Sequence, residues 1–221
     1  MSKENLRVTR DPRYHGKLSP IEAPGDIPDR WKGSPIEKLI LSHNFETEIE
    51  TSGNPELVIG TCIEFRYQPR IPSSFAYMLR RASGRLNGSE FSIAYTLAKG
   101  VRHLALIGHN DCGMAKVAEN KQLMIDALVE QGWYKDRAED YVNVNASRYA
   151  ISDELGALKN EYFRLRRLFQ KLEIAPLFLS LANSKIYMPG WYFQMIITGE
   201  VDKPVGAESP VRDDDLLTLL P

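Results

Sequence analysis

Three residues in this sequence carry the side chains that zinc prefers. The chain contains only two cysteines, Cys62 and Cys112, and His109 lies three positions before the second of them. Zinc binds thiolate sulfur and imidazole nitrogen in a tetrahedron, and a catalytic site has three protein ligands so that water can take the fourth position. His109 and Cys112 are close enough in sequence to bind one ion from a single turn. The residue types and their spacing therefore indicate a candidate zinc site with three ligands.

The same residues have a second interpretation. Cysteines at strand ends are often small buried hydrophobic residues, and a histidine after glycine is often a hydrogen-bonded loop residue. A disulfide is the weaker interpretation, because two thiols in a reducing compartment are more often free or metal-bound. The spacing alone is compatible both with a metal site and with two structural cysteines.

The elements around the candidate ligands must bring two distant segments together. Leu57–Cys62 is a short apolar run between turn residues, which predicts a buried strand ending at Cys62. Ser89 as a cap and Gly100 as a stop predict a helix between them, followed by a second buried strand at about 101–107. Parallel strands end at one edge of a sheet, where open α/β folds bind their ligands. We therefore expect the three candidate ligands to meet at that edge.

Further patterns complete an α/β domain. A capping box at Ser34–Glu37 predicts a helix through about Glu50. A stripe of apolar residues from Leu155 to Leu172 predicts an amphipathic helix that begins at residue 152 or 153. Alternating apolar residues over 191–198 predict an edge strand. The predicted fold class is α/β, with a mainly parallel central sheet flanked by helices.

Segments without regular patterns flank this domain. Residues 1–33 contain four prolines among charged residues, which predicts an extended N-terminal arm that could wrap a partner subunit. Residues 34–201 are then the zinc-binding α/β domain. Residues 202–221 are a C-terminal tail, in which the run Asp213–Asp215 is more plausibly solvated than a metal site. A length of 221 residues suits one domain of this kind.

Composition narrows the classes of partner. With 28 basic and 29 acidic residues, the net charge is -1, which provides no basic field for nucleic acid or for an anionic lipid surface. No apolar run approaches the ~20 residues of a membrane helix. The N-terminus is charged from the third residue and lacks the apolar stretch of a secretion signal. We expect a cytoplasmic protein whose partners are small molecules or other protein chains.

Two motifs resemble those of the β-class carbonic anhydrases. The segment Cys62-Ile63-Glu64-Phe65-Arg66 is similar to the family's Cys-x-Asp-x-Arg motif, and Gly108-His109-Asn110-Asp111-Cys112-Gly113 is similar to its Gly-His-x-x-Cys-Gly motif. Weaker similarity extends over about residues 35–201 and includes Arg80–Gly84, which resembles the family's Arg-Asn-Ala-Gly segment. The resemblance implies a zinc ion on Cys62, His109 and Cys112.

The resemblance also implies an activity. In the family, zinc lowers the pKa of a bound water, and the zinc-bound hydroxide converts carbon dioxide reversibly to bicarbonate. Glu64 and Arg66 match the carboxylate that orients this hydroxide and the arginine that keeps the carboxylate off the metal. Because two thiolates offset the charge of the ion, activity is expected to favour alkaline pH. The family pairs its subunits, so the expected assembly is a homodimer or a higher even homo-oligomer.

Departures from the family leave other functions open. Glu64 replaces the aspartate, the loop from Cys62 to His109 looks shorter, and Arg80–Gly84 lacks the asparagine. Relatives hydrolyse carbonyl sulfide or carbon disulfide on the same metal motif, which gives a second interpretation. The third is a non-catalytic zinc-bearing binding module in which Glu64 closes the site. The candidate proton shuttles, among which the sequence does not select, are His15, His43 and His103.

Overall fold

The computed structural model describes residues 11–204, and these form a six-stranded sheet with the order β1-β6-β5-β4-β2-β3. Four strands are parallel to one another: β2 (Leu57–Thr61), β3 (Ala76–Arg80), β4 (His103–His109) and β5 (Glu173–Ser180). β6 (Lys185–Pro189) is antiparallel to β5, and β1 (Leu18–Pro20), at the edge of the sheet, is antiparallel to β6. The predicted α/β class with a mainly parallel sheet is confirmed.

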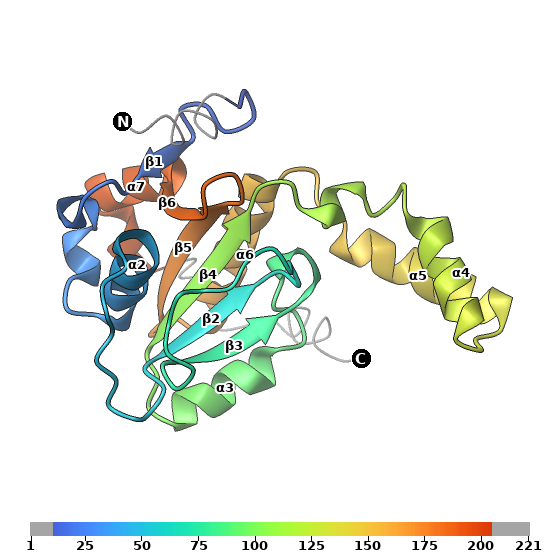
Figure 1. The fold of residues 1–221 in the computed structure, drawn as a ribbon, viewed down its shortest axis with the longest axis horizontal. Coiled ribbons are helices and arrows are strands. Elements are labelled where there is room, and N and C mark those ends of the chain that lie inside the picture. Colours follow the sequence, from blue (N-terminus) through green and yellow to red (C-terminus); the bar gives the residue numbers. More distant parts are fainter. Residues whose placement is uncertain (1–10, 205–221) are drawn as a thin grey trace.

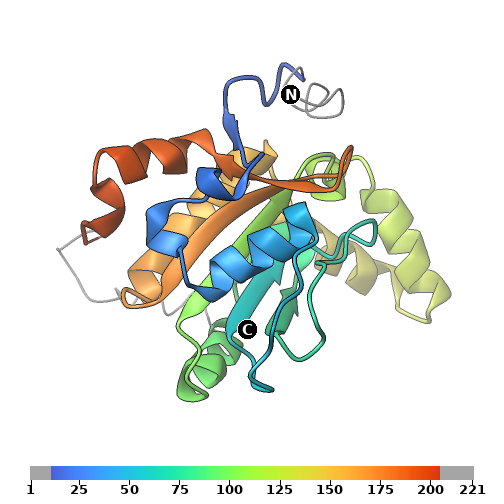
Figure 2. The ribbon, with the colours of Figure 1, turned by 60° about the vertical axis from the view of Figure 1, so that its left-hand side comes forward.

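Helices cover both faces of the sheet (Figures 1 and 2). α2 (Pro35–Phe45) covers one face, while α3 (Glu90–Ala98) and α6 (Glu154–Leu168) lie on the other, where Arg164 of α6 pairs with Glu90 of α3. α7 (Gly190–Ile197) follows β6, and α4 (Lys121–Glu130) and α5 (Lys135–Tyr149) form a hairpin that projects from the body (Figure 1). The described chain also has short 3-10 helices: η1 (Pro24–Asp26), η2 (Asp29–Trp31), η3 (Ala82–Gly84), η4 (Gly113–Lys116) and η5 (Glu200–Asp202). Among residues 11–204, every helix is too short or too polar to cross a membrane.

Helices α2, α3 and α6 begin where the sequence predicts. The Ser34 hydroxyl accepts hydrogen bonds from the backbone N–H groups of Ile36 and Glu37 and caps α2. Asp153 caps α6 by accepting from the Gly156 N–H. α2 ends at Phe45 rather than near residue 50, because the next residue has a left-handed backbone with φ 60, which stops the helix.

The segment predicted as an edge strand at 191–198 is a helix, α7, so that prediction is wrong. Its buried residues are Tyr192 and Met195, three positions apart, which is a helical spacing. The Tyr192 ring stacks on Trp31 with a centroid distance of 5.5 Å. A segment that is apolar at almost every position fits a helix as well as a strand, so the alternation did not discriminate between them.

Residues 11–33 of the predicted arm contain turns, β1, η1 and η2, and they pack against the domain. β1 pairs with β6, and Trp31 is completely buried in the main core. The Arg30 guanidinium donates two hydrogen bonds of 2.9 Å to the Glu173 carboxylate at the start of β5. That the N-terminal segment wraps a partner subunit stays a prediction. Residues 1–10 of the predicted arm and 205–221 of the predicted tail, with the run Asp213–Asp215, lie outside the described residues.

The substitution Trp31→Ala is expected to lower the free energy of unfolding by about 3–5 kcal/mol, because it empties a fully buried aromatic position. The measurement is urea unfolding followed by circular dichroism. Lys32→Ala is the matched control, since the neighbouring Lys32 side chain is 52% exposed and pairs only with a surface aspartate. Equal midpoints for Trp31→Ala and the wild type would show that this segment does not belong to the core.

Candidate metal centre

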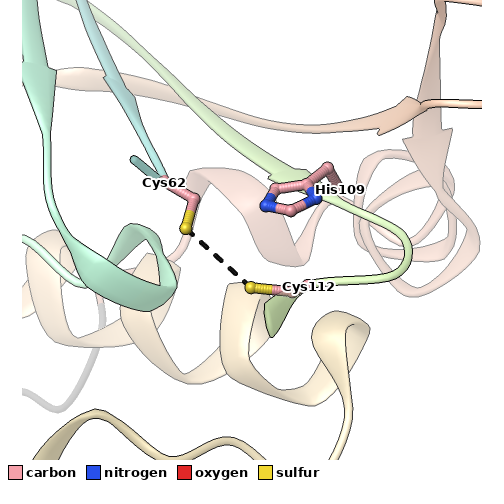
Figure 3. Close-up of side chains that lie close together, drawn as sticks. All are labelled: Cys62, His109 and Cys112. Atoms are coloured by element: carbon pink, nitrogen blue, oxygen red, sulfur yellow. Dashed lines mark hydrogen bonds between the residues drawn. The ribbon is translucent and has the colours of Figure 1, made fainter. Parts of the chain in front are cut away.

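The three candidate ligands lie together at the carboxyl ends of β2 and β4 (Figure 3). Cys62 follows β2, His109 is the last residue of β4, and Cys112 precedes η4. Because the strands are parallel neighbours, with Thr61 opposite Ile107, the two ligand loops start side by side. The ligand atoms of the three buried residues lie within 4.8 Å of one another. The structure thus brings the predicted set together.

The distance between the two sulfur atoms fits a shared metal ion. Cys62 Sγ and Cys112 Sγ are 3.8 Å apart, and both thiols are free. A disulfide bond would require about 2.05 Å. Two sulfurs, each about 2.3 Å from one zinc ion at the tetrahedral angle, would lie about 3.8 Å apart. The separation therefore matches two ligands of one zinc ion and excludes a disulfide in this conformation.

His109 presents one ring nitrogen for a metal bond. Its Nδ1 lies 2.9 Å from the carbonyl oxygen of Asn110, so we assign the proton to Nδ1, which donates to that carbonyl. Its Nε2 is buried and has no hydrogen-bond partner among the described residues. A buried polar atom without a partner costs about 1–3 kcal/mol. Bonding to a metal would remove this cost, and fixing one ring nitrogen through a backbone carbonyl is usual for histidine ligands.

The two thiols also influence each other's protonation. A hydrogen bond between the sulfurs lowers the pKa of Cys62 and raises that of Cys112. Burial raises both pKa values, and His109 contributes to the lowering at Cys62. One of the two residues therefore carries a negative charge readily, and the thiolate is the form that binds metals.

Arg66 holds the Glu64 carboxylate beside the ligands. Arg66 Nε and Nη2 donate to the two carboxylate oxygens at 2.7 Å each, and the Arg66 backbone N–H donates at 2.8 Å. These hydrogen bonds lower the pKa of Glu64 to about 2, so the carboxylate is ionised at neutral pH. Glu64 Oε2 is 3.9 Å from His109 Nδ1, and Glu64 does not belong to the ligand cluster. The carboxylate is close to the site without being a ligand.

Asp111 is a second partner of Arg66 that the sequence patterns did not single out. Arg66 Nη1 donates to Asp111 Oδ2 at 2.9 Å, and Nη2 donates to the Asp111 carbonyl at 3.0 Å. Arg66 therefore joins the loop after β2 to the loop after β4. A sequence signal existed, because Asp111 lies inside the second motif and aspartate is among the residues that tolerate the left-handed backbone found here, with φ 54.

Comparison with solved structures relates this architecture to known proteins. β-Carbonic anhydrase isoform I from Trichomonas vaginalis aligns with a TM-score of 0.51 and 16% identity, covering 68% of this chain and 91% of that chain. The fold is that of the β-carbonic anhydrases. The carbonic anhydrase from Streptococcus mutans aligns with a TM-score of 0.49 and 15% identity, covering 68% of this chain and 92% of that one.

A carbon disulfide hydrolase in its apo form also aligns, with a TM-score of 0.47 and 15% identity, covering 80% of this chain and 95% of that chain. No protein-family model matches this chain, and no curated protein matches its sequence. At these identities the similarity to solved structures is a similarity of fold.

Within this β-carbonic anhydrase fold, Arg80 supports the first ligand loop. Its guanidinium donates to the carbonyl oxygens of Cys62 at 3.4 Å, Glu64 at 3.0 Å and Tyr67 at 3.1 Å. Arg80, which lies in the weaker motif match, therefore supports the backbone that carries Glu64 and Arg66.

The three candidate proton shuttles lie outside the ligand cluster. His103 begins β4 while His109 ends it, so the two are about 20 Å apart along the strand. His43 is buried in α2, and burial lowers its pKa to about 4, so it is neutral at neutral pH. His15 is exposed in the N-terminal segment. The structure therefore places His103 far from the candidate ligands and leaves His43 neutral.

A small cavity adjoins the ligands. Its volume is about 20 Å³, and Cys62, His109 and Cys112 line it together with two glutamates of α6, Glu154 and Glu161. This volume holds about one water molecule. The candidate ligands therefore share a confined space with two buried glutamates.

Proposed function

We propose that this protein binds one zinc ion per chain and hydrates carbon dioxide reversibly to bicarbonate. The observation that carries the proposal is the ligand set: two thiols and one imidazole meet in a buried site, while Arg66 holds the adjacent Glu64 carboxylate. Zinc sites with three protein ligands and an open fourth position are the catalytic kind. When bound, zinc would lower the pKa of a coordinated water and so supply the nucleophile that attacks carbon dioxide.

The roles of the protein groups follow from their positions. Cys62, His109 and Cys112 would hold the metal. The ionised Glu64 carboxylate would accept a hydrogen bond from the reacting water and orient it. Arg66 would fix the Glu64 carboxylate and prevent it from moving onto the metal.

The interpretation as a non-catalytic binding module finds no support in this conformation, because it requires Glu64 as a fourth ligand. Both carboxylate oxygens of Glu64 instead accept hydrogen bonds from Arg66. From the motif resemblance we further propose a homodimer or a higher even homo-oligomer in the cytoplasm.

The test is stopped-flow hydration of carbon dioxide by the zinc-loaded protein at about pH 8.5, an alkaline pH chosen because two thiolates reduce the acidity of the nucleophile. We expect hydration above the buffer rate, lost after chelation and restored by added zinc. Carbonyl sulfide and carbon disulfide are assayed in parallel. Turnover of only these sulfur substrates would replace the proposed reaction by a hydrolase reaction, and a zinc-loaded protein inactive on all three substrates would refute the proposal.

A further inference from the structure

One peptide bond in the ligand loop is held from both sides by charged side chains. The carbonyl oxygen of Asp111 accepts a hydrogen bond from Arg66 Nη2 at 3.0 Å. The N–H of the same peptide, on Cys112, donates to Glu154 Oε1 at 3.3 Å. Arg66 comes from the loop after β2 and Glu154 from the first turn of α6. Two separate elements thus fix the peptide that immediately precedes a candidate metal ligand.

This peptide needs external support. Asp111 has φ 54, a left-handed conformation that aspartate tolerates better than most residues but that still costs free energy. Such a conformation persists where the surrounding contacts determine it. A relaxed turn would reorient the peptide and displace the Cys112 sulfur from its separation of 3.8 Å from Cys62. The two side-chain contacts therefore bear on the geometry of the candidate ligand set.

Glu154 occupies an unusual position for a carboxylate. Its exposed fraction is 7%, and it lines the cavity that the candidate ligands share. Within residues 11–204 it forms no ion pair, although the N-terminus of α6 provides a favourable dipole. A buried carboxylate is costly unless it is hydrogen-bonded, and Arg13 acts on Glu154 electrostatically without an ion-pair contact. The hydrogen bond from the Cys112 N–H is a direct contact that holds the carboxylate.

Glu161 provides a contrast within the same helix. It lies two turns after Glu154, is 4% exposed and lines the same cavity. Its carboxylate accepts from the Leu86 N–H at 2.9 Å and pairs with Arg164 at 2.7 Å. Glu161 therefore has its partners in the packing of α6 and makes no hydrogen bond to the ligand loop.

We propose that Glu154 and Arg66 are positioning residues that fix the Asp111–Cys112 peptide and thereby hold the Cys112 sulfur where zinc requires it. The inference rests on the proposed zinc site and gives Arg66 a second role besides restraining Glu64. Partners of metal ligands typically change metal affinity by about 10–100-fold when they are removed.

The experiment measures the zinc dissociation constant of the full-length chain by competition with a chromogenic chelator. Glu154→Met keeps the length of the side chain but removes the hydrogen-bond acceptor, and we expect its dissociation constant to rise by about 10–100-fold. Its unfolding midpoint in the presence of chelator should stay equal or rise, because a buried unpaired charge is removed. Glu154→Gln retains an oxygen acceptor and should bind zinc about as tightly as the wild type. Arg66→Ala should weaken binding as Glu154→Met does.

Glu161→Gln is the control, and we expect it to lower the unfolding midpoint without weakening zinc binding. The inference is overturned if the wild type binds zinc and Glu154→Met binds it equally tightly. It is also overturned if Glu154→Gln binds zinc as weakly as Glu154→Met, or if Glu161→Gln weakens zinc binding to the same extent. A wild-type chain that binds no zinc overturns the proposed function together with this inference, so the two failures are distinguishable.

Discussion

Each of the substitutions Cys62→Ser, His109→Ala and Cys112→Ser is expected to remove most of the zinc from a chain that otherwise holds about one ion. Structural zinc sites contribute about 10–16 kcal/mol of binding free energy from four ligands, so the loss of one ligand costs about 2.5–4 kcal/mol, roughly 60–700-fold in affinity. Among the described residues the cluster has three donors, and each is a proposed ligand, so the cluster holds no spare donor to replace the one that is lost. The measurement is elemental analysis after dialysis against a weak chelator.

The matched control for these ligand substitutions is His103→Ala. His103 lies on the same strand as His109 but at its opposite end, and it is half-buried, so its removal should leave the zinc content unchanged. Zinc retained in Cys62→Ser and Cys112→Ser at the wild-type level would refute the assigned site. In that case the two cysteines would be small buried residues, which is the alternative that spacing alone leaves open.

The proximity of the three candidate ligands could be predicted from sequence because each lies at the end of a short apolar pattern. Cys62 ends an apolar run, and His109 and Cys112 follow the next one, so only the parallel arrangement of two strands was needed to join them. The capping residues Ser34 and Asp153 could also be predicted from sequence, because a cap acts within three residues of its own position.

The supporting residues could not be predicted in this way. Glu154 reaches Cys112 across 42 positions, and this contact depends on where α6 begins relative to a turn whose shape the sequence does not specify. The hairpin α4–α5 was also not predicted, because its sequence is mostly polar and its small core of Ile125, Ala138 and Val142 forms only when the two helices pair. Local patterns predict what local interactions determine, and these contacts are not local.

The substitution Arg66→Ala is expected to lower kcat/KM for carbon dioxide hydration, per bound zinc, by on the order of a hundredfold. Two side-chain hydrogen bonds from Arg66 fix the Glu64 carboxylate, and Arg66→Ala removes both while the backbone N–H of residue 66 still donates to it. Held by the backbone alone, the carboxylate can rotate away from the reacting water or onto the metal. A misplacement of about 1 Å can have an effect of that size. Rates are compared at about pH 8.5 and normalised to zinc content, because Arg66 also contacts the Asp111–Cys112 peptide.

The pKa of Glu64 shows whether Arg66→Ala would displace the Glu64 carboxylate or neutralise it. Arg66 lowers that pKa to about 2, so removing Arg66 lets it rise toward its ordinary value of 4.5, still far below the assay pH. The carboxylate is therefore ionised in both proteins, and a slower reaction of the Arg66→Ala variant reflects a displaced carboxylate.

Glu64→Asp keeps the charge and restores the aspartate found in the similar family motif, so we expect it to raise activity above wild type. Arg70→Ala, which removes an arginine paired with Glu46 on the surface, is the control and should be fully active. If Arg66→Ala and Glu64→Asp both hydrate carbon dioxide at the wild-type rate, the Glu64–Arg66 pair has no part in the reaction.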